Sequence, residues 1–365
     1  MLRRLAVLKV CIISCGMIAN SAHIPAYRYF SEDFDIVGVS DIDAVSAETT
    51  AKRHGIPHWY TDACLMLEQC RPDVVSVCVP NCFHKQYVMM ALEYGAHVLC
   101  EKPLALTGAD AEEMFALAKR QGKILMACQS MRYTPDRLAA KRYIEDNGAD
   151  FYYTELSRIR RRGIPYWGAF HIKRISGGGA LVDIGVHMLD AAVWLMGNTE
   201  VLSVKGTASR HHASEIGDLA ASGALTGHVD RACTFDPAEM DVEDFAAGHV
   251  TFKNGAVMNF KVAWAANLPE EASIKLVGTD VGITLPEKQL YRGMDQTETL
   301  EPAAAPYPDH PFIGHFYLVD NLRQAIRGES SPAVKPQETI AVAQIMEAFY
   351  RSAQLGREEL VSLLP

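Results

Sequence analysis

The sequence lacks the marks of several large classes of protein. Its nine cysteines form no Cys-x-x-Cys pair, and their odd number and irregular spacing fit neither a zinc site nor a disulfide framework. The formal net charge of −9 comes without a basic stripe, which argues against nucleic acid as a partner. We therefore expect buried thiols in a reducing compartment and no nucleic-acid partner.

Long apolar runs are also missing. No run approaches the length that spans a membrane, and no repeat or low-complexity segment is present. The opening residues 1–9 resemble a signal peptide only briefly, because Lys9 interrupts the apolar stretch and no small-residue cleavage site follows. We expect a cytoplasmic protein without a membrane partner.

What is present is the composition of an ordinary globular protein. The 365 residues are 49% hydrophobic and 22% charged, and such a chain is long enough for two domains with real cores. Residues 1–128 alternate strand and helix patterns, and the apolar strands predict a parallel sheet covered on both faces. The expected strands are residues 9–14, 35–40, 74–79, 97–100 and 124–128. The expected helices are residues 19–30, 44–54, 63–68, 86–94 and 108–121.

The pattern changes after Cys128. Apolar residues then alternate as in an antiparallel or mixed sheet, at residues 151–159, 201–207, 244–252, 256–263, 273–278 and 282–285. Helices are expected at residues 135–145, 177–196, 314–327 and 337–354. We predict an α/β Rossmann-type domain over residues 1–128 and an α+β domain with one open sheet face over residues 129–365. The polar stretch 209–239 is not placed.

A glycine loop follows the first predicted strand. It reads Ser14-Cys-Gly16-Met17-Ile18-Ala, which matches the dinucleotide fingerprint G-x-G-x-x-G/A at its second and third positions and departs from it at Ser14. Gly16 stands where the backbone must approach a pyrophosphate. The helix that begins near Met17 would bind that pyrophosphate at its N-terminus.

An acidic residue follows the second strand at the expected distance. The carboxylate of Asp41 can accept both hydroxyls of an adenosine ribose, and Ile42 offers no cation to a 2′-phosphate. This favours NAD over NADP as the cofactor. A plain helix-capping role for Asp41, shared with Asp43, is the alternative.

Further cofactor contacts are expected at the carboxyl edge of the sheet, where open α/β sheets bind ligands. Pro80, Asn81 and His84 follow the third of these expected strands, and we expect main-chain contacts to a ribose there, with His84 as a helix cap or ribose neighbour rather than a catalytic group. Gln129 ends the last strand and could face the nicotinamide carboxamide.

Two motifs carry most of the chemistry. Glu101-Lys102-Pro103 ends an apolar strand, and a glycine-rich segment from Gly177 leads into a helix with Asp183 and His187 four residues apart, hence on one face. A lysine at a strand end and an Asp/His pair on a helix can together hold and deprotonate a hydroxyl group. A lysine in solvent would explain the first motif alone, and a histidine with its hydrogen bonds made within the fold would explain the second alone. The two motifs together, in this order, favour the functional interpretation.

These motifs make the chain similar to the glucose–fructose oxidoreductase, inositol dehydrogenase and rhizopine-catabolism (Gfo/Idh/MocA) family. The resemblance covers most of the length and rests on the following segments: the glycine loop through His23, Asp41, Val79–His84, Glu101–Pro103, Arg132–Pro135, Gly179–Asp190, Val242–Phe245 and Asn254–Ala256. It implies a Rossmann domain, a C-terminal open-faced sheet used for oligomerisation, and NAD(P)-dependent chemistry on sugars or cyclitols. Ser14 and residues 209–239 depart from the family pattern.

The resemblance also implies three catalytic roles. Lys102 would hydrogen-bond the reacting oxygen and stabilise its developing charge, His187 would act as a base near neutral pH, and Asp183 would hold a neighbouring hydroxyl or polarise His187. Whether Lys102 or His187 takes the proton stays open. The Lys102–Pro103 bond is a candidate cis peptide, and the Glu101–Lys102 segment is expected to contact the cofactor.

Substrate contacts are expected from the second domain. One predicted strand and the loop after it are rich in donors and aromatics: Arg158, Arg162, Tyr166, Trp167, His171 and Lys173. Core packing explains Trp167 about as well as a sugar platform does, and the basic run 158–162 is either a solvated strand edge or a contact for an anionic cofactor or substrate. His310 and His315 flank the last long loop and could close the site. The cluster His211-His212…Glu215…Asp218 does not have the helical HExxH spacing of a metal site, so no catalytic metal is expected.

Three functions remain open on these residues. The leading one is an NAD-dependent dehydrogenase of a sugar, sugar derivative, cyclitol or glycoside. The others are an NAD-recycling glycoside hydrolase or lyase with a 3-keto intermediate, and a non-catalytic NAD-binding regulator. We also expect a homodimer or homotetramer, built through an apolar open sheet face formed by Val257, Phe260 or Val262, Ile274 and Leu276.

Overall fold

The structure, a computed structural model, describes residues 7–165, 168–212 and 236–363. The chain forms two compact units. The first comprises the residues up to Ala105, Asp110–Ser130 and Tyr307–Pro336. The second comprises Leu106–Ala109, Met131–Pro306 and Gln337–Pro365.

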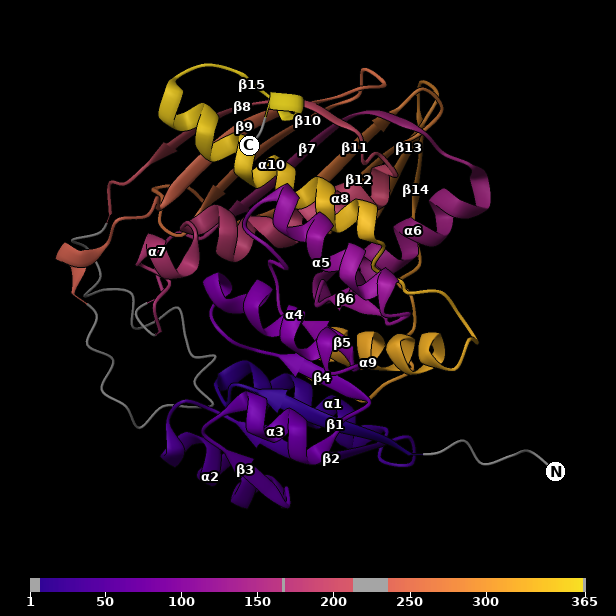
Figure 1. The fold of residues 1–365 in the computed structure, drawn as a ribbon. Coiled ribbons are helices and arrows are strands. Elements are labelled where there is room, and N and C mark those ends of the chain that lie inside the picture. Colours follow the sequence, from indigo (N-terminus) through magenta and orange to yellow (C-terminus); the bar gives the residue numbers. More distant parts are fainter. Residues whose placement is uncertain (1–6, 166–167, 213–235, 364–365) are drawn as a thin grey trace. The chain divides into compact units, whose positions relative to one another are not determined.

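The first unit contains the parallel sheet that the sequence predicts, with six strands where five were expected, coloured indigo to purple in Figure 1. All its pairings are parallel, in the order β3-β2-β1-β4-β5-β6. The strands are β1 Leu8–Ile13, β2 Phe34–Ser40, β3 His58–Tyr60, β4 Val74–Val77, β5 His97–Cys100 and β6 Leu125–Ala127. The sequence did not predict β3, because its three side chains are exposed or half-buried and carry no apolar pattern.

Helices connect these strands as the sequence predicts: α1 Ile24–Tyr29, α2 Ala44–His54, α3 Ala63–Cys70, α4 His84–Glu93 and α5 Gly108–Arg120. A π-helical turn, Ala19–His23, precedes α1. Asp43 and Asp62 cap α2 and α3 with their carboxylates, so both helices begin where an aspartate satisfies the first free backbone N–H groups.

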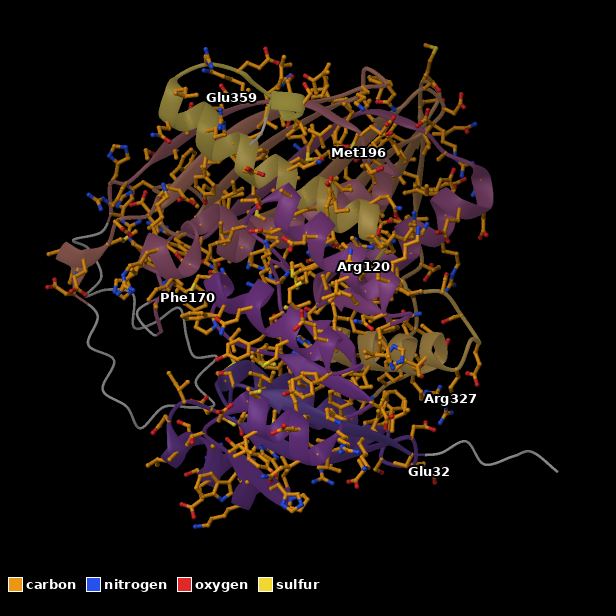
Figure 2. All side chains as sticks on the ribbon, in the orientation of Figure 1. Glu32, Arg120, Phe170, Met196, Arg327 and Glu359 are labelled. Atoms are coloured by element: carbon orange, nitrogen blue, oxygen red, sulfur yellow. The ribbon has the colours of Figure 1, made fainter. Side chains whose placement is uncertain are left out.

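The division of the chain differs from the predicted 1–128 and 129–365, because residues 307–336 return to the first unit. This segment contains α9, Ile313–Ile326, which buries Phe316 and Leu322. Arg323 and Arg327 at the end of α9 both donate to the carboxylate of Asp33, and Figure 2 labels Arg327. Such long-range packing leaves no mark in the local pattern of the sequence.

The second unit is built on a mixed sheet of nine strands, as predicted. Its order is β14-β13-β12-β11-β7-β10-β9-β8-β15, and β7 with β10 is its parallel pairing. The strands are β7 Phe151–Ile159, β8 Val201–Ser209, β9 Phe245–Phe252, β10 Val257–Ala263, β11 Glu271–Gly278, β12 Gly282–Leu285, β13 Gln289–Arg292, β14 Gln296–Thr299 and β15 Glu359–Leu360. The last three are short, and the sequence did not predict them.

Helices cover one face of this sheet, as Figure 1 shows for α8 and α10. The helices of the second unit are α6 Pro135–Asn147, α7 Lys173–Ser176, α8 Val186–Met196 and α10 Pro336–Leu355, with a π-helical turn at Leu181–Gly185 before α8. Apolar residues of α8 and α10 pack with alternate residues of the central strands into one core. Trp264, which follows β10, is among its largest fully buried side chains.

The prediction of an apolar open face is wrong for most of the residues chosen. Phe260, Val262, Ile274 and Leu276 are buried in the helix-covered core, and Val257 alone of the five is partly exposed. The alternate positions carry a polar network instead: Tyr153, Glu155, Ser157, His249, Asn259, Lys261, Glu271, Ser273 and Lys275. A two-residue period reveals two faces, but it does not reveal which one the helices cover.

The expectation about membrane-length segments needs correction. Lys173–Met196 is long and apolar enough, by length and composition alone, to cross a membrane. Within the fold, 83% of its most apolar window is buried. That burial is what a core helix shows, since a segment surrounded by its own protein has an apolar environment without lipid.

Free thiols are found where the sequence predicts them. Every cysteine that the structure describes is free; Cys64 is exposed and Cys82 is half-buried. The others are buried: Cys11, Cys15, Cys70, Cys78, Cys100 and Cys128. Cys233 lies outside the described residues.

Candidate functional site

The glycine loop is held at the carboxyl end of β1 by the strand beside it. Ser14 has a φ of 77°, in the left-handed region where the fingerprint has glycine. Its N–H donates to Ser40 (2.7 Å), and its hydroxyl donates to Asp41 (3.3 Å). These bonds keep Ser14 in a conformation that a non-glycine residue rarely adopts.

Gly16 leaves the loop open for a ligand. A Cβ built there would meet nothing nearer than the Ser14 hydroxyl oxygen, at 3.9 Å, and the residue is exposed. Met17 and Ile18, which begin the following turn, are half-buried. The side chain of Asn20 donates to the carbonyl oxygens of Cys15 (2.8 Å) and Gly16 (3.0 Å), and these two hydrogen bonds stabilise the loop. No pattern in the sequence predicts this role of Asn20.

Asp41 ties the glycine loop to β2. One carboxylate oxygen accepts the N–H of Cys15 at 2.8 Å, and the other accepts the N–H of Asp43 at 3.0 Å. The N-cap of α2 is Asp43, so the alternative in which Asp41 is a plain helix cap is wrong. Ile42 is 88% exposed and lies beside this carboxylate in the chain.

His84 links two loops at the carboxyl edge of the sheet. Nδ1 lies 2.7 Å from the carbonyl oxygen of Pro103, and Nε2 lies 2.9 Å from that of Val79. Burial lowers the pKa of His84, and the two carbonyl oxygens oppose this shift. Pro80 and Asn81 lie between these contacts; Asn81 opens a short 3₁₀ turn.

The Lys102–Pro103 bond is cis, as the sequence indicated. Lys102 is half-buried, and its backbone N–H donates to Glu101 at 3.3 Å. Gln129 follows β6 and is 1% exposed. Within the described part of the chain, its side-chain oxygen has no hydrogen-bond partner.

Glu101 is the centre of a buried hydrogen-bond network in the first unit. Its Oε1 accepts from Nε2 of His23 and from Nε2 of His315, each at 3.0 Å. Nδ1 of His23 lies 3.0 Å from the Ser76 hydroxyl, which lies 2.9 Å from that of Tyr27. Burial alone would raise the pKa of Glu101, but the two histidine hydrogen bonds reverse this, and its pKa is well below the ordinary value.

His23, Glu101, Cys128 and His315 also have the atoms to hold a metal ion, since their ligand atoms lie within 4.8 Å of one another. Hydrogen bonding accounts for the contacts of the two histidines without one, because both Nε2–H groups donate to the ionised carboxylate of Glu101. His315 was expected to flank a loop near the substrate; it is buried on Glu101 instead. His310 accepts the backbone N–H of Phe312 at 3.1 Å.

In the second unit, Asp183 and His187 share one face, as predicted. In the stretch from Gly178 to Val193 they are the two residues that are not buried. Asp183 lies in the π-helical turn and His187 in the first turn of α8. Trp264 donates its indole N–H to Oδ2 of Asp183 at 2.9 Å, a contact that the sequence did not reveal.

The glycines before Asp183 allow a close approach of backbone segments. A Cβ at Gly179 would lie 1.9 Å from the carbonyl oxygen of Glu243. The carboxylate of Glu243 accepts the N–H groups of Gly179 (2.9 Å) and Leu181 (3.0 Å) and the hydroxyl of Tyr350 (2.9 Å). Glu243 therefore caps the helical segment that carries Asp183, although it lies far away in the chain.

Asp190 has a structural role on the buried side of α8. Both its oxygens accept from Arg132 at 2.6 Å, and Arg132 also donates to Glu338 of α10 at 2.6 Å. Burial raises the pKa of Asp190, and the guanidinium opposes this rise. The bidentate pair anchors α8 one turn beyond His187.

The predicted substrate-binding residues of the second unit differ in their surroundings. Arg158 is half-buried, and Asp183 and Glu270 are close enough to act on its charge. Arg162 instead donates to Asn267 at 2.9 Å in an exposed loop, and His171 is buried. Tyr166, Trp167, Glu215 and Asp218 lie outside the described residues.

Comparisons with known proteins agree with this architecture. A family model described as an oxidoreductase family with an NAD-binding Rossmann fold matches residues 8–129, and one of the Gfo/Idh/MocA C-terminal domain matches residues 152–284. The chain is 32% identical to a D-glucoside 3-dehydrogenase of Escherichia coli over 96% of each chain. It is 29% identical to a D-apiose dehydrogenase of Paraburkholderia graminis over 97% of this chain and 90% of the relative.

A solved structure of levoglucosan dehydrogenase with NADH and levoglucosan has the same fold. The TM-score is 0.79 at 23% identity, covering 98% of this chain and all of the other. The two units of the present chain correspond to the two family models, apart from the return of residues 307–336 to the first unit.

Proposed function

Because the chain belongs to the Gfo/Idh/MocA family of oxidoreductases and carries its NAD-binding Rossmann domain, we propose that it is an NAD-dependent dehydrogenase. It would move a hydride to or from the carbon of a secondary hydroxyl in a sugar, sugar derivative, cyclitol or glycoside. The observation that carries this proposal is the pair Asp183 and His187, partly exposed on an otherwise buried helix, with Asp183 oriented by Trp264. The sugar dehydrogenases among the relatives support the substrate class.

The residues of the glycine loop fit a dinucleotide. The exposed Gly16 leaves its backbone accessible, and the N-terminus of the following helical turn is free of any acidic side chain. Ser14, Gly16, Met17 and Ile18 would hold the pyrophosphate. Main chain at Pro80 and Asn81, together with His84, Glu101, Lys102 and Gln129, would line the ribose and nicotinamide portions.

Three side chains of this chain would act on the substrate hydroxyl, while the bound nicotinamide supplies the hydride acceptor. Lys102 stabilises the negative charge that develops on the oxygen. His187 or Lys102 takes the hydroxyl proton, and Asp183 accepts a hydrogen bond from a neighbouring hydroxyl. The hydrogen bond from Trp264 orients Asp183 for that contact. Arg162, Tyr166, Trp167 and His171 are proposed as further substrate contacts.

The cofactor preference proposed is NAD over NADP. Oδ2 of Asp41 accepts the N–H of Cys15 and the hydroxyl of Ser14, whereas Oδ1 accepts the N–H of Asp43 and retains a lone pair for a ribose hydroxyl. A 2′-phosphate would meet this negative charge, and the exposed Ile42 provides no compensating cation.

The test is a panel of sugars, cyclitols and glycosides incubated with the protein and NAD, followed by nicotinamide absorbance and by chromatography. A dehydrogenase produces one reduced cofactor for each ketone formed. Cleavage of a glycosidic bond without net reduced cofactor would instead favour the NAD-recycling hydrolase or lyase. Tight NAD binding with neither reaction across the panel would contradict the proposal and favour a regulator.

A further inference from the structure

We propose that Arg158 binds an anionic group on the substrate, so that the preferred sugar or cyclitol carries a carboxylate or a phosphate. This inference rests on the proposed function, because it assigns a substrate class to the same site. Arg158 lies on β7 on the side of the sheet that the helices cover, two residues beyond Leu156 and four beyond Thr154, both fully buried.

The surroundings of Arg158 offer no carboxylate in contact. Its cross-strand neighbours are Val262 on β10 and Ala272 on β11, both small and apolar. Ala272 is exposed, so the covering helices do not close over this end of the sheet. Within the described part of the chain, no hydrogen bond or ion pair holds the Arg158 guanidinium.

A second guanidinium, that of Arg137, also contacts no carboxylate within the described residues. Arg137 of α6 is 5% exposed and donates to the Met131 carbonyl oxygen (2.6 Å) and to the Met188 sulfur (3.2 Å), neither of which carries a charge. Arg158 is close enough to Arg137 for its charge to lower the pKa of that guanidinium, which burial already lowers. The second unit therefore holds two guanidinium groups that are close enough to influence one another and that contact no carboxylate within the described residues.

Other interior arginines of this chain do contact carboxylates. Arg132 has a bidentate contact with Asp190 and a second with Glu338, and Arg323 has both Asp33 and Asp320. A half-buried charge without a partner is costly, and a ligand that supplies the counter-charge recovers that cost. The guanidinium fork matches the paired oxygens of a carboxylate or a phosphate.

The location connects this cation with the reacting hydroxyl. Asp183 is near enough to raise the pKa of Arg158, although burial and the neighbouring Arg160 lower it overall. Asp183 itself is held by Trp264, which follows the strand paired with β7. An anion on Arg158 would thus belong to the same small molecule whose hydroxyl groups reach Asp183 and His187.

The first experiment measures kcat/KM on matched substrates: a sugar carboxylate, a sugar phosphate and the neutral parent sugar of each. We expect the wild type to prefer one anionic form by about 100-fold. Arg158→Ala should lower kcat/KM on that form by about 100-fold, with less than about a threefold change on the neutral parent, and Arg158→Lys should retain part of the preference. The control Arg161→Ala removes an exposed arginine of the same basic run. A preference for the neutral parents, or an equal loss on both forms with Arg158→Ala, would overturn the inference.

The second experiment separates this inference from the proposed function. Calorimetry of the same carboxylate and phosphate with the NADH-loaded protein needs no turnover. Binding that is lost in Arg158→Ala supports the anion site even if no hydride transfer is found, and that result would refute only the dehydrogenase. Absence of binding by either anion overturns the anion site. Thermal unfolding without ligand is a further check, since Arg158→Ala should leave Tm unchanged or raised if the arginine is an unpaired recognition group, whereas a structural arginine would lower it.

Discussion

Trp264 is fully buried at the end of β10 and donates its indole N–H to Oδ2 of Asp183 at 2.9 Å. The contact joins the sheet of the second unit to the helical turn that carries a proposed substrate-binding carboxylate. Removing this hydrogen bond therefore tests the role of Asp183 in the proposed reaction.

Trp264→Phe should lower kcat by about tenfold, because Asp183 loses the donor that orients it while the aromatic packing is largely kept. Steady-state kinetics on the substrate identified by the panel would measure this. Trp194→Phe, which alters a half-buried tryptophan on α8, is the matched control. Equal losses in both variants would mean that Trp264 acts through packing alone.

Asp41 should set the choice of cofactor. Asp41→Ser combined with Ile42→Arg should narrow or reverse the preference for NAD, because a cation replaces a carboxylate where a 2′-phosphate would bind. Fluorescence titration with both reduced cofactors measures the ratio of the two Kd values. The single variant Ile42→Ala, at an exposed side chain, should leave the ratio near that of the wild type. A wild type that binds NADP more tightly than NAD would remove this role of Asp41.

Stability should fall on the acid side of neutrality. Burial lowers the pKa of His23 and of His84, and it lowers the pKa of His97 to about 4. Since the unfolded chain takes up these protons first, the free energy of unfolding decreases as the pH falls from about 6.5 through the folded pKa values. Denaturant titrations across that range measure the slope.

His97→Asn provides the comparison for that slope. Nδ1 of His97 accepts the backbone N–H of Ile124 at 3.0 Å, and an asparagine oxygen can accept a similar bond without titrating. The variant should therefore lose less stability than the wild type between about pH 6.5 and about pH 4. An unchanged slope would show that His97 is protonated in the folded protein.

Self-association through the open sheet face remains a proposal. The residues on this face are polar rather than apolar, so the contact would be formed by charged and polar side chains. Glu155 with Lys275, and Glu271 with Lys261, place both signs of charge on this face. Two copies related by a twofold axis can pair such a face with itself. Light scattering at micromolar concentration should give at least twice the monomer mass, and Lys261→Glu with Lys275→Glu should reduce it. A wild type that stays monomeric at high concentration would contradict the proposal.

The sequence predicted the elements whose cause is local. The parallel strands of the first unit other than β3 are largely apolar runs, and the glycine loop and the Asp183/His187 spacing lie within single segments. The return of α9 to the first unit, the cap that Glu243 forms on a distant helix, and the Trp264–Asp183 contact depend on residues far apart in the chain. The open face was misassigned because alternation gives two equivalent faces until the position of the helices is known.

The central claim is that Lys102 and His187 move the hydroxyl proton during hydride transfer. The most direct test is the rate of nicotinamide reduction by Lys102→Ala and by His187→Ala, beside Lys52→Ala and His58→Ala, which alter exposed residues. We predict a loss of about 100-fold or more in kcat for each of the first two variants, nearly unchanged NADH binding, and wild-type rates for the two controls. A near-normal rate in either Lys102→Ala or His187→Ala on the true substrate would contradict the account.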